Sequence, residues 1–323
     1  MNRGSLPALL LLLATSCFAQ PSSLFRFETD DFWLNLHHFL YVLGRAEAKT
    51  PDSNRAAVAS APSDAAAGLQ ELTPGEDRLW GEAVSFYAKG LSLRDAVFDD
   101  SASKLTLALA GKRDTSSLAG LDANPEVVRT LQQAAPMYRR AWWPRHHLAK
   151  VARRVELQKL VNAHGERVLA FITRAYGMKW PAEGFPVHFS GYANWAGAYS
   201  TGGILLVFSS LDSALAGTEG LETIFHEGMH QWDARMIPLL EGHARALRLE
   251  VPPRLSHAMI FYTAGEAVRS IFPEHVPYAS ANGVWKRGLE PLRQALEAAW
   301  KPWLEGRGTR DAAIDRLLKR CAQ

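Results

Sequence analysis

The chain has 323 residues, of which 47% are hydrophobic, 21% charged and 10% aromatic. This composition is typical of a folded globular protein and excludes a disordered or fibrous one. The formal net charge of +3, from 36 basic and 33 acidic residues, is too small for a polyanion-binding surface, so we expect no nucleic-acid partner. Two cysteines are too few for a disulfide scaffold or a four-cysteine zinc site.

Residues 1–19 have the form of a secretory signal. Arg3 precedes the short apolar run Leu6–Ala14, and Cys17-Phe18-Ala19 offers small residues on either side of Phe18 for a cleavage site before Gln20. The alternative is a lipid anchor on Cys17. In both cases we expect an exported protein, periplasmic or extracellular. No later apolar run is long enough for a membrane span.

The next two regions are predicted from periodicity and composition. Residues 20–72 are expected to form an N-terminal helix, from the helical spacing of apolar residues over 23–49, and an Ala-rich linker over about 50–68. A helical region is expected over 73–144. It begins with Thr73-Pro74-Gly75-Glu76, which has the form of a capping box with proline at the first helical position.

Residues 145–323 are expected to form a further domain. A long helix should follow Pro144 and end near Tyr176. Short strands are predicted over 185–189 and 202–208, because apolar residues there are bounded by glycine, proline and serine. The pattern from about Gly220 onward is helical. The predicted fold class is α+β and predominantly α-helical.

One motif carries the chemistry. His226-Glu227-Gly228-Met229-His230 has the form His-Glu-x-x-His. Residues four apart lie on one face of a helix, so the two imidazoles can hold one Zn²⁺ ion. Glu227 lies about 100° further round the helix and is the candidate general base. The helix is predicted to be amphipathic and packed on a core through an apolar stripe of Leu221, Phe225, Gly228 and Trp232. Gly228 is expected to allow another element to approach closely.

A third ligand is needed for a catalytic zinc site. Asp233 lies three residues after His230 and is expected to orient a histidine rather than to bind the metal. Glu266, in a second amphipathic helix, is the expected third ligand. Glu241 and His243 are the alternatives.

A strand-like segment, then His-Glu-x-x-His, then a helix with Glu266, resembles the gluzincin metallopeptidases and is similar to secreted bacterial peptidase MA-like proteins. The resemblance covers about residues 145–323. It implies a zincin-like catalytic domain with a backing helix, a small twisted sheet, an active-site helix and a glutamate helix. It also implies an edge strand that binds extended substrate through its backbone, a role assigned to Ile204 and Leu205. The familiar Asn-Glu-x-x-x-Asp form is missing, because Gly265 precedes Glu266 and Ser270 follows it by four.

The expected mechanism is hydrolysis by water on zinc, with Glu227 as the proton carrier. An oxyanion donor is also needed. Tyr262, one turn before Glu266, is the first choice, and the alternatives left open are His243, His257, His275 and Tyr278.

Two further groups of residues are conspicuous in the sequence. The loop that holds Tyr192, Asn194, Trp195 and Tyr199 is either a flap over the substrate, with Asn194 and Trp195 in contact with it, or an ordinary aromatic loop packed on the sheet. The adjacent histidines 37–38 and 146–147 point about 100° apart on a helix, so we interpret them as structural.

The sequence therefore predicts an exported zinc-dependent peptidase with one Zn²⁺ ion and a peptide or protein substrate. The alternative is a catalytically inactive zincin-fold protein that serves as a binding or scaffold module. Glu227 favours the enzyme, because a metal-binding scaffold has no need of a general base. A third idea is that residues 20–72 form an inhibitory pro-segment, which would have to act sterically since no cysteine there can cap the metal.

Overall fold

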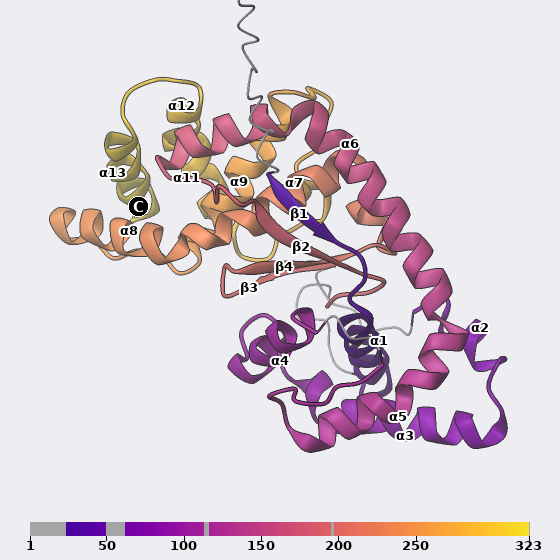
Figure 1. The fold of residues 1–323 in the computed structure, drawn as a ribbon. Coiled ribbons are helices and arrows are strands. Elements are labelled where there is room, and N and C mark those ends of the chain that lie inside the picture. The colour runs from indigo at the N-terminus through magenta and orange to yellow at the C-terminus, as the bar shows by residue number, and fades with distance from the viewer. Residues whose placement is uncertain (1–23, 50–61, 113–115, 195–196, 323) are drawn as a thin grey trace, which may run out of the picture.

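A four-stranded mixed sheet runs through the middle of the molecule, with helices on both sides (Figure 1). Its strands are β1 (Phe25–Glu28), β2 (Phe185–Ser190), β3 (Ala198–Thr201) and β4 (Leu205–Ser209), in the spatial order β1-β2-β4-β3. The first, second and fourth strands are parallel, and β3 runs antiparallel to β4 at one edge. The predicted class, α+β with mostly helices, is confirmed.

The computed structural model describes residues 24–49, 62–112, 116–194 and 197–322. The signal predicted at residues 1–19 and most of the predicted linker lie outside these ranges. Within them, no helix combines the length and apolar character needed to cross a membrane.

Thirteen α-helices lie in the described ranges. They are α1 (Phe32–Glu47), α2 (Ala65–Leu69), α3 (Pro74–Lys89), α4 (Asp100–Ala110), α5 (Pro125–Ala141), α6 (Trp143–Tyr176), α7 (Gly217–Met229), α8 (Asp233–Leu247), α9 (Leu255–Arg269), α10 (Tyr278–Ala281), α11 (Glu290–Ala299), α12 (Lys301–Leu304) and α13 (Arg310–Cys321). Short 3₁₀ segments lie at Leu91–Leu93, Ser213–Leu215 and His230–Trp232. The predicted capping box is present at the start of α3, and the predicted long helix is α6, which ends at Gly177 in the left-handed conformation.

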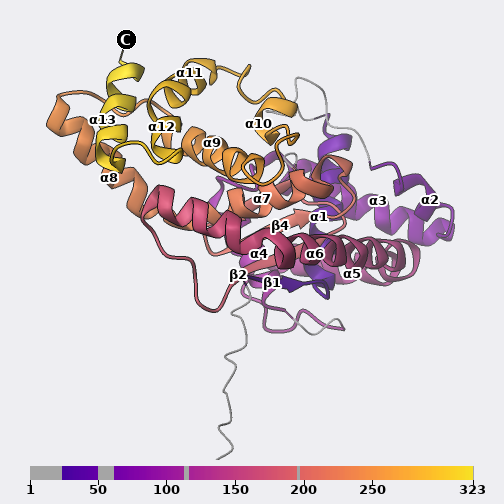
Figure 2. The ribbon, with the colours of Figure 1, turned by 90° about the horizontal axis from the view of Figure 1, so that it is seen from above.

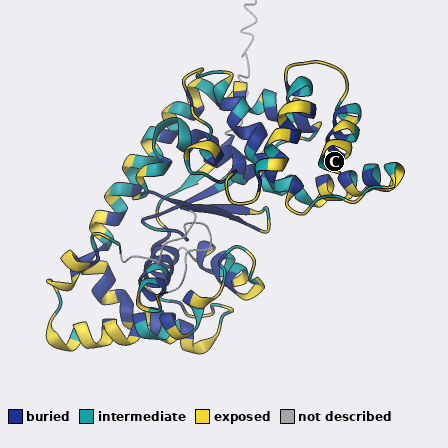
Figure 3. Ribbon diagram, turned by 180° about the vertical axis from the view of Figure 1, so that it is seen from behind, coloured by how far each residue is buried: buried dark blue, intermediate teal, exposed yellow. Residues whose placement is uncertain are grey.

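The two faces of the sheet pack against different helices. Side chains alternate along β4, so that Leu206 and Phe208 join one hydrophobic core while Leu205 and Val207 join the other. The first core includes side chains of α6, α7, α8, α9 and α11, and the second includes side chains of α1, α3, α4 and α5. Figure 2 shows the same arrangement from above, and Figure 3 shows that the strands and the inner faces of the helices are buried.

Two strands were not expected. Residues 25–28 were predicted as part of a helix, but Phe25 pairs with Phe185 in the parallel pairing of β1 with β2. Ala198 and Tyr199 are expected in the aromatic loop over 191–199, but with residues 200–201 they form the edge strand β3. Four residues are too few to show a periodicity, so such strands are defined by their partners in the sheet. The first strand also shows that the sheet is not confined to residues 145–323.

Part of the predicted linker is ordered by side-chain contacts. Residues 65–69 form the short helix α2. Just before it, Asp64 accepts hydrogen bonds from His146 Nε2 at 2.8 Å and from the Tyr192 hydroxyl at 2.6 Å. The segment from residue 62 to residue 68 is therefore attached to α6 rather than being a free surface loop.

Candidate metal centre

Helix α7 places the His-Glu-x-x-His motif against the first core. Leu221, Phe225 and Met229 are fully buried on its inner face. Gly228 lies under the indole of Trp180, where a Cβ atom would approach within 2.4 Å of a ring carbon. The expected close approach at Gly228 is confirmed, and it fixes the rotation of the helix so that His226 and His230 face away from the core.

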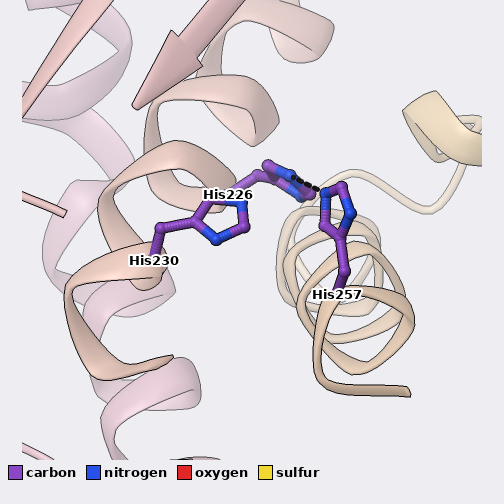
Figure 4. A group of neighbouring side chains, drawn as sticks. All are labelled: His226, His230 and His257. Atoms are coloured by element: carbon purple, nitrogen blue, oxygen red, sulfur yellow. Dashed lines mark hydrogen bonds between the residues drawn. The ribbon is translucent and has the colours of Figure 1, made fainter. Parts of the chain in front are cut away.

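Among the described residues, His226, His230 and His257 form a group that could hold a metal ion, with ligand atoms within 4.8 Å of one another. Figure 4 shows the first two projecting from one helix and His257 approaching them from α9. The Nε2 atoms of His226 and His257 lie 3.3 Å apart. Two nitrogens bound to one tetrahedral zinc, each at about 2.05 Å, are separated by roughly 3.3 Å. The separation of this pair is therefore that of two ligands on one tetrahedral ion.

Hydrogen bonding at Nδ1 leaves Nε2 of His230 available as a metal ligand. Its Nδ1 donates to Asp233 Oδ2 at 2.7 Å, and Asp233 Oδ1 accepts from the Ser256 hydroxyl at 2.8 Å. The orienting contact expected for Asp233 is therefore present. With Nδ1–H engaged, Nε2 of His230 is the atom that can serve as a ligand, as in the carboxylate–histidine–zinc arrangements of known metal sites.

The protonation states also suit a metal site. Burial, followed by the charges of His230 and His257, holds the pKa of His226 well below its usual value. Burial, followed by His230, lowers the pKa of His257 to about 3. Burial also tends to lower the pKa of His230, but the hydrogen bond that His230 donates to Asp233 and the charge of Glu227 outweigh it and raise that pKa. Two of the three imidazoles are thus neutral near pH 7, as a metal ligand must be.

Glu227 lies in the same cleft, with Oε1 3.9 Å from His226 Nε2. Burial raises the pKa of this carboxyl, against lowering contributions from the charge of His230 and a backbone hydrogen bond of Ser200. A carboxylate with a raised pKa is a stronger base than an exposed one. Its position beside the histidines agrees with the role predicted from the motif.

The structure does not bring Glu266 into the group. Glu266 lies nine residues after His257, which on a helix is about 180° round and about 13 Å along the axis. Its Oε1 pairs instead with Arg269 at 2.7 Å. The alternatives lie elsewhere as well: His243 bonds to Asp315 at 2.7 Å and Glu241 faces Arg245. The third member is His257, in the first turn of α9, which sequence reasoning considered only as an oxyanion donor.

Tyr262 also lies away from the cleft. Its ring belongs to the first hydrophobic core, and burial followed by the nearby charge of Glu266 raises its pKa. It does share the face of Glu266, as predicted, but that face points away from the histidines. Of the other candidates for an oxyanion donor, His275 is buried against Glu222, and Tyr278 lines the cleft.

A cleft of about 660 Å³ runs past the histidines. One wall is the edge strand β3. Gly203, in the turn after this strand, packs closely against His230 and Gln231. A Cβ atom there would lie 2.8 Å from Gln231 Cα, and φ is +64°, so only glycine fits well. Ile204 lies in this turn, and Leu205 pairs with Thr201 inside the sheet. The strand that lines the cleft is therefore β3, and not the two residues expected.

The aromatic residues expected in a loop pack into the second core. Tyr199 lies in β3, and its hydroxyl contacts His38 at 2.8 Å and Thr106 at 3.0 Å. In the loop before β3, the ring of Tyr192 stacks on Phe39. Asn194 is buried and does not line the cleft, whereas Trp195 lies outside the described residues. The placed residues of this loop thus support the packing interpretation rather than the flap.

Comparison with known proteins gave no match to any protein-family model, curated protein or solved structure. What the site can do follows from its geometry: three converging imidazoles, a carboxylate beside them, and an open cleft next to β3, the edge strand of the sheet.

Proposed function

We propose that the chain is an exported zinc-dependent peptidase in which His226, His230 and His257 hold one zinc ion. Export would depend on the signal proposed at residues 1–19. The observation that carries the proposal is the convergence of three imidazoles from two helices within 4.8 Å, inside a cleft that also contains Glu227. With His257 in place of a glutamate, the proposed site departs from the gluzincin pattern at the third ligand while keeping the zincin-like placement of the motif helix beneath a sheet.

A zinc ion held by three histidines keeps an open position, lowers the pKa of water there and polarises a carbonyl group. The residues of the chain would do the rest. Glu227 would take the proton of the attacking water and pass it to the leaving amine. Tyr278 is the candidate donor that lines the cleft; its ring lies parallel to that of Phe261 with centroids 6.4 Å apart.

The substrate would lie along β3. Residues 198–200 line the cleft, and β3 pairs with β4 on one side only. An extended peptide can add to such an edge as a further strand, with backbone hydrogen bonds that do not depend on its sequence. This geometry suits a peptide substrate better than a small metabolite.

The decisive experiment is metal analysis of the purified mature protein beside His257→Ala and Glu266→Ala. We expect about one zinc per wild-type chain, loss of that zinc in His257→Ala, and retention of it in Glu266→Ala, the matched control on the same helix. Retention in His257→Ala with loss in Glu266→Ala would overturn the ligand set.

Peptide hydrolysis is tested separately from metal binding. Glu227→Gln should keep its zinc and lose hydrolysis of a general peptide mixture. A wild type that binds zinc but shows no hydrolysis dependent on Glu227 would contradict the peptidase and support the inactive binding module instead.

A further inference from the structure

The charges that line the cleft are unevenly placed, although the chain as a whole carries only +3. The charged side chains are Glu222, Glu227, Asp233, Arg254 and Arg287. The acids are buried or half-buried on the motif helix and just after it, whereas both arginines are exposed. The rim of the cleft is therefore positive.

The acids are engaged with partners of their own. Glu222 Oε2 accepts from His275 Nε2 at 2.6 Å and from the backbone N–H of Tyr278 at 2.8 Å. Asp233 accepts from His230 and Ser256. Across the described ranges, neither arginine has an acidic partner within ion-pairing distance. No acidic side chain within those ranges neutralises their charge.

Arg254 lies directly before the first residue of α9, three residues before His257. Its φ of 65° is in the left-handed region. It lines the same cleft as the three histidines.

Arg287 is connected to the residues that precede the motif histidines. Its Nη2 donates to the carbonyl of Asn282 at 2.7 Å, just after α10, and α10 begins at Tyr278, whose backbone N–H donates to Glu222. Arg254 instead lies two residues before Ser256, whose hydroxyl donates to Asp233. Since Glu222 precedes the two motif histidines along the chain and Asp233 follows them, the two arginines are connected to opposite sides of the motif.

We propose that the cleft selects peptides that carry a carboxylate, with Arg254 and Arg287 as the recognising side chains. This inference rests on the proposed peptidase function and names its substrate class. A guanidinium binds a carboxylate through two parallel hydrogen bonds, and two exposed positive charges at the rim attract ligands of the opposite charge. The carboxylate can come from an acidic side chain or from the free C-terminus of the substrate.

The test measures binding of labelled peptides to zinc-loaded Glu227→Gln protein, so that no turnover is needed. One pair of blocked peptides differs only by glutamate or glutamine. A second pair has no acidic side chain and differs only by a free or an amidated C-terminus. The variants Arg254→Gln and Arg287→Gln are compared with Arg248→Gln and Lys286→Gln. Arg248 is an exposed arginine that also has a positive φ, and Lys286 is an exposed neighbour of Arg287; neither lines the cleft.

We expect the carboxylate member of at least one pair to bind about fivefold more tightly, and the pair identifies the source of the carboxylate. The preference should fall in Arg254→Gln or Arg287→Gln, remain in both controls, and shrink in concentrated salt because exposed charges are screened. Equal binding of both members in both pairs, or ratios that neither arginine variant changes, would overturn the inference.

The two proposals can fail separately. If wild-type protein cleaves peptides but shows no preference for carboxylates, the recognition fails and the peptidase stands. If carboxylate peptides bind preferentially but none is cleaved, the peptidase fails and the recognition stands as a binding property.

Discussion

Histidines lie on both sides of the sheet, but their ring nitrogens meet different partners. On the side of the second core, His38 bonds to the Leu34 carbonyl and the Tyr199 hydroxyl, both at 2.8 Å. His146 bonds to the Tyr138 hydroxyl and to Asp64, also both at 2.8 Å. In the cleft, by contrast, Nδ1 of His226 has no partner among the described residues, and its Nε2 faces another imidazole.

The difference separates structural histidines from candidate ligands. A buried imidazole whose two nitrogens both meet hydrogen-bond partners is satisfied and stabilises the fold. Imidazole nitrogens that converge on one another leave lone pairs without donors, which a cation would satisfy. The structural interpretation of the histidine pairs at 37–38 and 146–147 agrees with the contacts of His37, His38 and His146. The predictions below test this distinction.

The largest effect is expected at Glu227. Because only a carboxylate can accept the proton of the attacking water, Glu227→Gln should lower kcat by about a thousandfold while zinc content stays unchanged. Steady-state kinetics and metal analysis on the same sample check this. Residual activity within a factor of about ten of wild type would show that Glu227 is not the base.

His146→Ala tests the other side of the sheet. It would leave the Tyr138 hydroxyl without its His146 partner, leave Asp64 with the Tyr192 hydroxyl but without His146, and open a cavity, so unfolding in urea should require about 3 kcal/mol less free energy. Zinc stoichiometry of the folded protein should not change. His226→Ala should show the reverse: loss of zinc with a smaller effect on the metal-free fold. Zinc loss in folded His146→Ala would contradict the distinction.

Asp233→Asn tests whether the hydrogen bond to Asp233 orients His230 for metal binding. The weaker acceptor should hold His230 less firmly and reduce zinc affinity by about 10- to 100-fold, measured by competition with a chelator. Ser256→Ala removes only the hydrogen bond to Asp233 Oδ1 and should have a smaller effect. An unchanged affinity in Asp233→Asn would show that the contact does not orient the ligand.

The free energy of unfolding should vary with pH because buried histidines are protonated in the unfolded chain before they are in the folded one. Burial lowers the pKa of His38 to about 4, so between pH 6.5 and 4 the unfolded chain binds a proton that the folded chain does not. Stability should therefore fall as the pH falls through this window, and His38→Gln should flatten the slope by about 1.4 kcal/mol per pH unit. Denaturation in urea at several pH values measures this. An identical slope in the variant would mean that His38 is protonated in the folded protein.

Local signals in the sequence were sufficient for much of the fold. The capping box at Thr73, the extent of α6 and the amphipathic motif helix follow from patterns within one or two turns, and the structure confirms them. The strands β2 and β4 were also predicted, because each carries a longer apolar run. The edge strand β3 and the first strand were not, because four residues acquire a strand identity only from their neighbours in the sheet.

The candidate site divides in the same way. His226, Glu227, His230 and Asp233 lie within eight residues of sequence, so helical geometry alone related them to one another. The third member could not be found in this way, because both Glu266 and His257 lie on the one helix α9. The choice between them depends on which face of that helix meets α7.

Periodicity along the chain is enough to show which side chains can act together within one helix, since the 3.6-residue period is a local property of the backbone. Three relations depend instead on how distant segments pack: His257 approaches the motif histidines, β3 forms a wall of the cleft, and Arg254 and Arg287 line that cleft. Those relations depend on how separate elements pack against a shared core, and packing is settled by contacts between residues far apart in the chain.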